Sequence, residues 1–278
     1  MIRQLTEHKE LLAAQRLYES IWRSSTPPVT AELMRALIKS GNYVSGAFDG
    51  EDLIGACAGF CSPPAASTLH SHIAGVAAGM RGRDIGYALK MDQREWAMER
   101  GIKAITWTFD PLIRRNAHFN LAKLGADVTE YLPDLYGQMG DDINGGGESD
   151  RLLVTWDLVA AGPRPITAAA PMGPGTSADG GQAAGMIGPG ASVDGGPAAG
   201  AIGLGISPDS LPLRGTTTGH TVLVAVPPDI EALRATNPAA ANEWRHAVRD
   251  VLGGLLAEGA RVTGFDKSGW YVVERNES

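Results

Sequence analysis

The stretch HSHIAGVAAGMRGRDIGYALKMDQREWAMERG, His70 to Gly101, decides how this chain is organised. It reads as a strand over residues 70–78, a turn rich in glycine and arginine over residues 79–88, and a helix that Gly101 ends. Main-chain N–H groups are free at a helix start, and the helix dipole adds partial positive charge there. The turn therefore predicts a site for an anion such as a diphosphate.

Two helices and a hairpin are expected before this stretch. Apolar residues recur at helical spacing over residues 8–22, and Thr30 can cap a second helix that carries apolar residues up to residue 38. The segments YVSGAF (43–48) and LIGACAGF (53–60) flank the turn DGED and read as a β-hairpin. The strand over residues 70–78 is expected to extend the same sheet.

The segments after Gly101 complete an alternation of strands and helices. KAITWTF (103–109) reads as a strand reached by a parallel crossover, and RRNAHFNLAKLGA (114–126) reads as a short helix. ADVTEYL and RLLVTWDL (151–158) read as two further strands. We predict an α/β fold, with a central mixed β-sheet flanked by helices.

The composition changes sharply after residue 159. GPGTSADGGQAAGMI (173–187) is followed at once by GPGASVDGGPAAGAI (188–202), a duplication of Gly, Ala and Pro that offers little to bury. We expect three parts: a domain over residues 1–159, a flexible linker over 160–218 and a small α/β extension over 219–278 that packs on the first domain. HTVLVAVP, from residue 220, would start the extension.

Charge and hydropathy narrow the class of protein. The net charge of −7 and a pI near 5.4 argue against a general nucleic-acid surface, which needs clustered Lys and Arg. No stretch approaches the ~20 apolar residues of a membrane span, and the N-terminus is too polar for a signal peptide. We expect a cytoplasmic protein without membrane contact. Cys57 and Cys61, without His or Cys partners nearby, are predicted to be reduced core thiols and not metal ligands.

The turn resembles the signature of the Gcn5-related N-acetyltransferase superfamily: a strand-end valine, then Arg or Gln, two variable residues, Gly, one variable residue, and Gly or Ala. Val76, Arg81 and Gly86 match this pattern. The resemblance implies an N-acyltransferase that uses acetyl-CoA or another acyl-CoA and a small-molecule amine, without a metal. The residues implied to hold the acyl-CoA are Val76, Ala78, Arg81, Gly82, Arg83, Asp84, Ile85, Gly86, Tyr87 and Ala88.

Two positions depart from the superfamily. Asp84 replaces a glycine, and at 4 Å a unit negative charge would repel a diphosphate charge by roughly 4 kcal/mol at an effective dielectric near 20. Asp84 can adopt the left-handed backbone of glycine or turn its carboxylate back as a helix N-cap. Leu121 stands where the superfamily often has a tyrosine that protonates the leaving thiolate. Tyr131 or Tyr136 could substitute, or the thiolate could leave without an acid; Tyr136 is our candidate.

The resemblance also implies that a bulge splays the central strand from its neighbour and that the Val76 amide binds the thioester oxygen. Gly75 is the expected place for the bulge, because strand glycines often mark one. His70 and His72 lie two apart and share a face of the strand. Either they are structural, or one is the base that takes a proton from the amine, in which case His72 is the better candidate.

His70 and the charged residues after the next strand are candidates for binding the acceptor. Asp110 could hold its amino group, or could simply shape the turn with Pro111. Arg114 and Arg115 could pair with a substrate carboxylate, or could be solvated at a helix start.

Five segments together, LHSHIAGV, GYALKMDQREWA, ITWTFDPL, RNAHFNLAKLGA and SDRLLVTW, are similar to a bacterial subfamily of acetyltransferases. Some of its members are associated with N-acylamino acid racemases and with N-succinylation of amino acids. This similarity implies an amino acid or similar primary amine as acceptor, with acetyl or succinyl transfer. Two alternatives are left open: a non-catalytic acyl-CoA-binding regulator, and an interaction module without CoA affinity. A homodimer is left open as the assembly.

Overall fold

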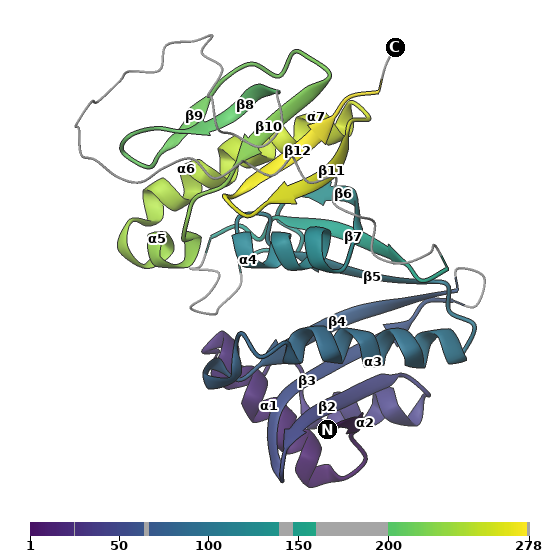
Figure 1. The fold of residues 1–278 in the computed structure, drawn as a ribbon. Coiled ribbons are helices and arrows are strands. Elements are labelled where there is room, and N and C mark those ends of the chain that lie inside the picture. Colours follow the sequence, from purple (N-terminus) through teal and green to yellow (C-terminus); the bar gives the residue numbers. More distant parts are fainter. Residues whose placement is uncertain (25, 64–66, 139–146, 160–199, 277–278) are drawn as a thin grey trace, which may run out of the picture.

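A computed structural model describes the chain except for residues 25, 64–66, 139–146, 160–199 and 277–278. The described residues form a seven-stranded sheet, with order β1-β2-β3-β4-β5-β7-β6, and a five-stranded sheet, with order β11-β12-β10-β8-β9. The first sheet belongs to the N-terminal part and the second to the C-terminal part, and helices flank both (Figure 1). The predicted α/β fold with a mixed sheet is confirmed.

The two N-terminal helices form where their apolar stripes and caps predict. Helix α1 (His8–Trp22) starts with a capping box between Glu7 and Glu10, and α2 (Ala31–Lys39) starts with Thr30, whose hydroxyl accepts from the Leu33 N–H at 3.2 Å. A short edge strand that the sequence did not predict, β1 (Ile2–Gln4), precedes them and pairs antiparallel with β2. Three residues carry too little alternation to be seen as a strand from sequence.

The predicted hairpin and crossover build the centre of the first sheet. Strands β2 (Tyr43–Asp49), β3 (Asp52–Cys61) and β4 (Thr68–Val76) pair antiparallel in succession. Helix α3 (Ile85–Glu99) then returns the chain so that β5 (Ala104–Phe109) lies parallel to β4. Strands β6 (Asp127–Leu132) and β7 (Arg151–Asp157) complete this sheet with antiparallel pairs.

Alternation along the central strands assigns the helices to opposite faces of the sheet. Tyr43 and Cys57 belong to the core that contains Leu89 of α3, whereas the next residues, Val44 and Ala58, belong to the core under α1 and α2. Successive strand residues point to opposite faces, so α3 covers one face and α1 the other. The buried Cys57 confirms its predicted place in the core.

Cys61, the second cysteine predicted to be buried, is exposed. It is the last residue of β3 and lies beyond the buried middle of that strand. The prediction followed from the apolar run around Cys61 and the absence of His or Cys partners nearby, and neither signal reveals where a strand leaves the core.

A bulge interrupts β4, but not at Gly75. Ile73 pairs with Ala58 and Ser71 pairs with Gly59, so His72 is the extra residue, whereas Gly75 pairs regularly with Ala56. The bulge reverses the alternation: Ser71 faces α3, and Ile73 faces the core under α1. Gly75 is small for a different reason, since a Cβ there would meet Ile21 Cδ1 of α1 at 2.6 Å.

Strands β4 and β5 form a fork. Their parallel pairing covers Thr68, Leu69 and His70, which pair with Ala104, Ile105 and Thr106, while β4 continues to Val76 and β5 to Phe109. Beyond these pairs, the two strands separate (Figure 1). The turn after β5 leads into the short helix α4 (Arg114–Ala117) and the π-helix η3 (His118–Lys123), which complete the predicted helical segment.

The C-terminal part begins earlier than the sequence predicted. Strands β8 (Ala201–Ile206) and β9 (Pro212–Arg214) lie inside the range expected to be linker, so its boundary at residue 218 is wrong. Glycines in β8 and directly after β9 reflect close packing: a Cβ on Gly203 would meet Val222 at 2.6 Å, and one on Gly215 would meet the Ile202 carbonyl oxygen at 2.1 Å. Residues 173–199 of the duplication lie outside the described ranges.

The rest of this part is a small α/β unit. Strands β10 (Thr221–Ala225), β11 (Arg261–Asp266) and β12 (Trp270–Glu274) join β8 and β9 in the second sheet. Helices α5 (Ile230–Thr236) and α6 (Pro238–Val248), the π-helix η4 (Arg249–Gly253) and α7 (Gly254–Ala257) pack against it. A single hydrophobic core joins the unit to α3, β5 and β7 of the first sheet.

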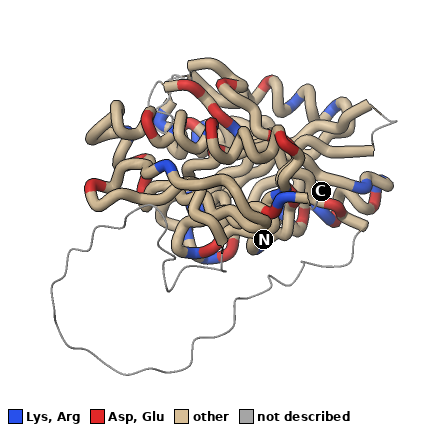
Figure 2. The backbone as a smooth tube through the Cα atoms, turned by 90° about the horizontal axis from the view of Figure 1, so that it is seen from above, with Lys and Arg blue, Asp and Glu red and all other residues tan. Residues whose placement is uncertain are grey.

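Acidic and basic residues are interspersed over the elements in Figure 2. Together with the net charge of −7, this distribution gives the described elements no long basic stripe of the kind that follows a nucleic-acid backbone. Among the described residues, none of the helices has the length and apolar character to cross a membrane.

Gly59 tests the packing opposite the bulge. A Cβ at this position would lie 2.7 Å from the His70 carbonyl oxygen and 3.3 Å from the Ser71 Cα, both main-chain atoms that cannot turn away. We expect Gly59→Ala to lower the free energy of unfolding by about 1–3 kcal/mol, measured by urea denaturation. Gly264→Ala, where a Cβ meets nothing within 4 Å, is the matched control. Equal stability of Gly59→Ala and Gly264→Ala would show that Gly59 is not tightly packed against the main chain of His70 and Ser71.

Candidate active site

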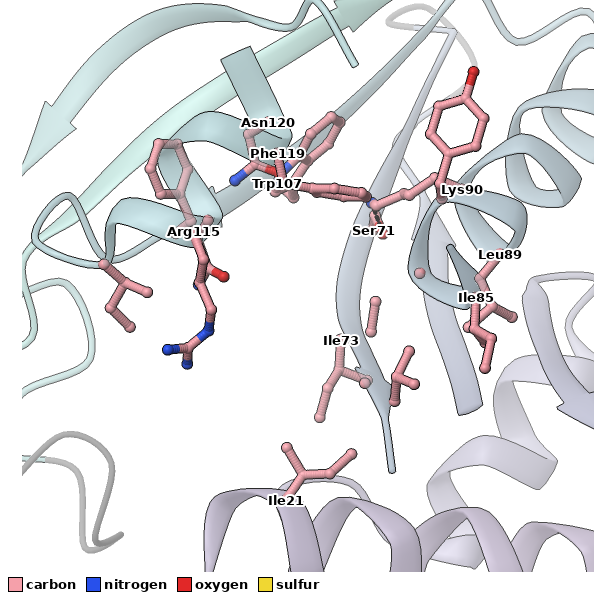
Figure 3. A pocket seen from close by; sticks show the side chains of 18 of the residues that line it. Ile21, Ser71, Ile73, Ile85, Leu89, Lys90, Trp107, Arg115, Phe119 and Asn120 are labelled. Carbon is pink, nitrogen blue, oxygen red and sulfur yellow. Dashed lines mark hydrogen bonds between the residues drawn. The ribbon is translucent and has the colours of Figure 1, made fainter. Parts of the chain in front are cut away.

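A pocket of about 520 Å³ occupies the fork between β4 and β5. Its walls come from the β4 residues 71–76, the turn before α3, the first turns of α3, residues 107–110 at the end of β5, and α4 with η3. Ile21 and Trp22 at the end of α1 close it from the other face. Figure 3 shows Ile73, Lys90, Trp107, Arg115 and Asn120 around this space. The separation of the two strands therefore creates the cavity.

Two main-chain amides of β4 are directed into the fork. The Ala77 N–H donates to the Ile54 carbonyl of β3 at 2.9 Å, so the alternation of an antiparallel pair turns the N–H of Val76 and Ala74 away from β3. That side is where β5 has separated. Val76 lines the pocket as the sequence predicted, and Ala74 supplies a second donor of the same kind that it did not predict.

The start of α3 presents further amides at the other end of the pocket. The Ala88 N–H makes the first helical bond, to the Asp84 carbonyl at 2.9 Å, so the amides of Ile85, Gly86 and Tyr87 precede the helical ladder. Gly82 has φ 79°, and the chain turns there before the helix begins. This geometry suits an anion, whereas the Ala88 amide is already used within the helix.

Most of the predicted acyl-CoA residues lie together on this pocket. Those that line it are Val76, Arg81, Gly82, Asp84, Ile85, Gly86 and Tyr87, whereas Ala78, Arg83 and Ala88 lie outside its lining. Arg83 reaches Asp49 at 3.9 Å, at the end of β2. A role for each of these residues in binding stays a prediction.

Asp84 adopts one of the two conformations proposed for it. Its φ of 57° is left-handed, as in the glycine it replaces, but its side chain caps no helix amide. The carboxylate instead forms an ion pair with Lys123, from the last turn of η3. Sequence reasoning missed this pair because the two residues are far apart in the chain. The Lys123 ammonium partly offsets the negative charge of Asp84, although both side chains are exposed to solvent.

The two histidines flank the closed end of the fork differently. His70 Nδ1 lies 3.2 Å from the Thr106 hydroxyl, at the last β4–β5 pair, whereas His72 lines the pocket. Their ring centroids are 6.3 Å apart, so they share a face even with the bulge. Burial lowers the pKa of both, which keeps the rings neutral near pH 7. His72 therefore lines the pocket as a neutral imidazole, which is the form that a base requires.

Tyr136 reaches the fork from the loop before β7. Its hydroxyl lies 3.1 Å from the hydroxyl of Thr108, which lines the pocket. Tyr131 points elsewhere, with its hydroxyl donating to Asp150 at 2.7 Å, and its pKa is raised by burial and by that carboxylate. Of the two tyrosines considered as substitutes for Leu121, only Tyr136 is near the pocket.

The three charged residues predicted to bind the acceptor contact the C-terminal unit. The Asp110 carboxylate accepts from Arg234 at 2.5 Å and from the Leu112 N–H at 2.9 Å; its side chain is 5% exposed. Arg115 forms a two-pronged ion pair with Glu231 of α5. Asp110 and Arg115 also line the pocket. The C-terminal unit therefore holds the β5–α4 turn in place.

Arg114 joins the same contact. Its guanidinium donates to the Val226 carbonyl through Nε at 3.1 Å and Nη2 at 2.5 Å, and its pKa is lowered by burial. Of the three residues, it alone is outside the pocket lining. Both arginines lie at the start of α4, as the sequence predicted, and both contact the C-terminal unit; the Arg115 side chain also stays 52% exposed to solvent.

Sequence reasoning missed a buried polar cluster at the closed end of the fork. Lys90, on α3, is 5% exposed, and its ammonium donates to the Ser71 hydroxyl at 2.7 Å and to the Gln93 amide oxygen at 3.3 Å. It also lies 4.0 Å from the centre of the Trp107 ring. Burial lowers the pKa of Lys90 to about 8. The signal was in the helix pattern, because Lys90 and Gln93 fall on the same face as Leu89 and its apolar neighbours.

Within the described ranges, no three His, Cys, Asp or Glu side chains come together in a way that could hold a metal ion.

Comparison with known proteins gives structural similarities alone. No family model and no curated protein matches this chain. Solved structures that it resembles include a ribosomal-protein-alanine N-acetyltransferase from Brucella melitensis, with 17% identity and a TM-score of 0.48 over 56% of this chain and 99% of that one. An N-acetyltransferase from Staphylococcus aureus has 16% identity and a TM-score of 0.46 over 57% and 98%. An aminoglycoside 6'-N-acetyltransferase complexed with coenzyme A has 17% identity and a TM-score of 0.44 over 59% and 99%.

The Arg234–Asp110 pair supports a stability prediction. Both side chains are almost fully buried, so Arg234→Met leaves an aspartate charge in the interior without its partner. We expect this variant to lose about 3–5 kcal/mol of unfolding free energy by urea denaturation. Arg214→Met is the control, because Arg214 and Asp250 are more than half exposed, and its cost should stay below about 1 kcal/mol. Similar losses in both variants would show that the buried pair does not hold the β5–α4 turn.

Lys90 gives the stability of the protein a pH dependence with a defined sign. Between pH 8 and its ordinary pKa of 10.5, the unfolded chain keeps a proton that the folded chain has released. Stability contributed by this group therefore rises with pH across that window, by about 3 kcal/mol in total at ~1.4 kcal/mol per pH unit. We expect wild type to gain this amount relative to Lys90→Met in denaturation at pH 8 and pH 10.5. Parallel profiles for the two proteins would be the opposite result.

Proposed function

We propose that this chain is an acyl-CoA-dependent N-acyltransferase of the Gcn5-related type. The observation that carries the proposal is the fork, in which Val76 and Ala74 direct their amides toward a pocket whose other end is the open start of α3. A strand that keeps unused donors beside a cavity needs a ligand or water to satisfy them. A thioester attached to a diphosphate supplies acceptors for both places.

In this proposal the acyl-CoA lies along β4. Its diphosphate accepts from the amides of Ile85, Gly86 and Tyr87, with Arg81 nearby, and Lys123 offsets the charge of Asp84. The acyl group points toward the closed end of the fork. This places the thioester oxygen within reach of the β4 amides.

The chemistry that follows is direct transfer. The nitrogen of a neutral amine attacks the thioester carbonyl carbon, a C–N bond forms, and the C–S bond breaks as the tetrahedral intermediate collapses. Main-chain N–H of β4, with Val76 as the candidate, stabilises the oxyanion. His72 accepts the proton from the nitrogen, directly or through water. Tyr136 returns a proton to the thiolate, unless CoA leaves as the anion.

The acceptor we propose is a primary amine, with an amino acid as the class that the sequence similarity implies. It would approach from the α1 face, where His72, Ile21 and Trp22 line the pocket. Asp110 and Arg115 are already paired with Arg234 and Glu231 of α5. Their effect on the acceptor would come from positioning the β5–α4 turn in the pocket wall.

Calorimetric titration with CoA tests the binding half of this proposal. Wild type should bind CoA, and Asp84→Asn should bind it about threefold to tenfold more tightly, since a repelling carboxylate is removed while Lys123 is released to attract the diphosphate. Asp250→Asn, a neutralised surface aspartate on η4, should bind like wild type. The gain in Asp84→Asn should shrink as salt is raised.

Amine-dependent release of CoA, with products identified by mass spectrometry from acetyl-CoA or succinyl-CoA and mixed amino acids, tests the catalytic half. Acylated amine in the products supports the enzyme. Binding of CoA without amine-dependent release would favour the regulator, and the absence of binding at millimolar CoA would favour the interaction module. Either of these results would reject the acyltransferase.

A further inference from the structure

Lys90 is a buried cation in the wall of the pocket. It lies in the second turn of α3 and is 5% exposed. Its ammonium reaches from α3 across to β4, where it donates to Ser71 at 2.7 Å, with the Trp107 ring beside it (Figure 3). Lys90 takes no part in the transfer steps proposed for this pocket.

The groups around Lys90 are neutral. Its acceptors are the Ser71 hydroxyl and the Gln93 amide oxygen, and Gln93 in turn donates to the Cys57 sulfur at 3.3 Å. Burial raises the pKa of the Cys57 thiol, so the thiol stays protonated and supplies no charge near pH 7. In the part of the chain that the structure describes, none of the ion pairs includes Lys90. Such a charge is costly to bury unless an anion joins it.

Lys90 sits at the closed end of the fork. Ser71 and Trp107 are the first residues of β4 and β5 beyond the last pair, His70 with Thr106, and Lys90 contacts both. The start of α3, with Gly82 and Gly86, is at the opposite end of the pocket. A ligand that spans the start of α3, where a Cβ on Gly86 would lie 3.8 Å from Val76, and Lys90 therefore lies along β4.

Asn120 supplies a second donor at the same end. It is 5% exposed, and its amide oxygen accepts from the Trp107 indole N–H at 3.1 Å. Its amino group is a donor that this contact does not use, and Asn120 lines the pocket (Figure 3). The Lys90 ammonium and the Asn120 amide both contact Trp107, and a carboxylate can accept hydrogen bonds through both of its oxygens.

We propose that Lys90, with Asn120, forms a carboxylate-binding subsite at the closed end of the pocket. The inference rests on the proposed function, because it takes the carboxylate to be part of a reacting substrate. That carboxylate belongs either to the far end of the acyl chain or to the acceptor. Both sources share the same recognition chemistry, and Lys90 selects the substrate by its charge without touching the reacting atoms.

Binding and turnover with matched substrates separate the two sources. In the acyl arm, succinyl-CoA is compared with butyryl-CoA, which lacks the carboxylate; in the acceptor arm, an α-amino acid is compared with its carboxamide. We expect wild type to prefer the carboxylate by about tenfold or more in one arm and Lys90→Met to lose that preference. Lys39→Met removes a surface charge at the end of α2 and should keep it. An unchanged preference in Lys90→Met in both arms overturns the subsite.

A second measurement uses the wild-type protein and does not depend on turnover. In wild type carrying ¹³C at lysine Cε, the Lys90 resonance is titrated by NMR with butyrate and with butyramide. A bound carboxylate stabilises the ammonium, so butyrate should raise the pKa of Lys90 from about 8 while butyramide leaves it there. No shift with millimolar butyrate overturns the subsite. If CoA esters fail to bind while butyrate shifts Lys90, the acyltransferase fails and the carboxylate subsite stands.

Discussion

The separation of β4 from β5 is the constraint on which the rest of this structure depends. After His70 the two parallel strands no longer pair, and the amides of Ala74 and Val76 face a cavity in place of a neighbouring strand. The lost ladder is tolerated because those amides can bind water or a ligand. The bulge at His72 adds a second consequence, since it turns Ser71 toward α3 and Ile73 toward α1. One extra residue thus supplies both a polar closed end and an apolar wall.

The C-terminal unit is part of the pocket's framework. Arg234, Glu231 and the Val226 carbonyl engage residues 110–115, the turn that carries α4 and η3 to the fork. The Tyr271 hydroxyl adds a buried hydrogen bond to the Pro111 carbonyl at 2.7 Å. A buried ion pair fixes the relative position of its two partners more than it stabilises the fold, because the cost of desolvating the charges offsets their attraction. Asp110, Arg114 and Arg115, which the sequence offered as substrate-binding residues, therefore influence the pocket by fixing the position of this turn.

Charge is distributed along the pocket in a way that distinguishes its two ends. At the start of α3, donors are main-chain amides, and the Lys123 cation is paired with Asp84 in an exposed setting. At the closed end, the Lys90 ammonium is buried among neutral groups. Solvent screens the first end, whereas the low dielectric around the second strengthens any interaction with a negative group. Discrimination between substrates is consequently expected at the closed end.

The sequence alone determined the order of most elements between residues 8 and 158, the hairpin, the crossover helix and the turn that precedes this helix, because periodicity, caps and glycines are local signals. It also placed Val76 and His72 on the pocket. Only the tertiary structure decided that the bulge lies at His72 and that Lys123 forms an ion pair with Asp84. It also decided that the arginines at 114 and 115 bind the C-terminal unit and that Lys90 is buried. Each of these depends on residues that are distant in the chain, and periodicity carries no information about which distant partners meet.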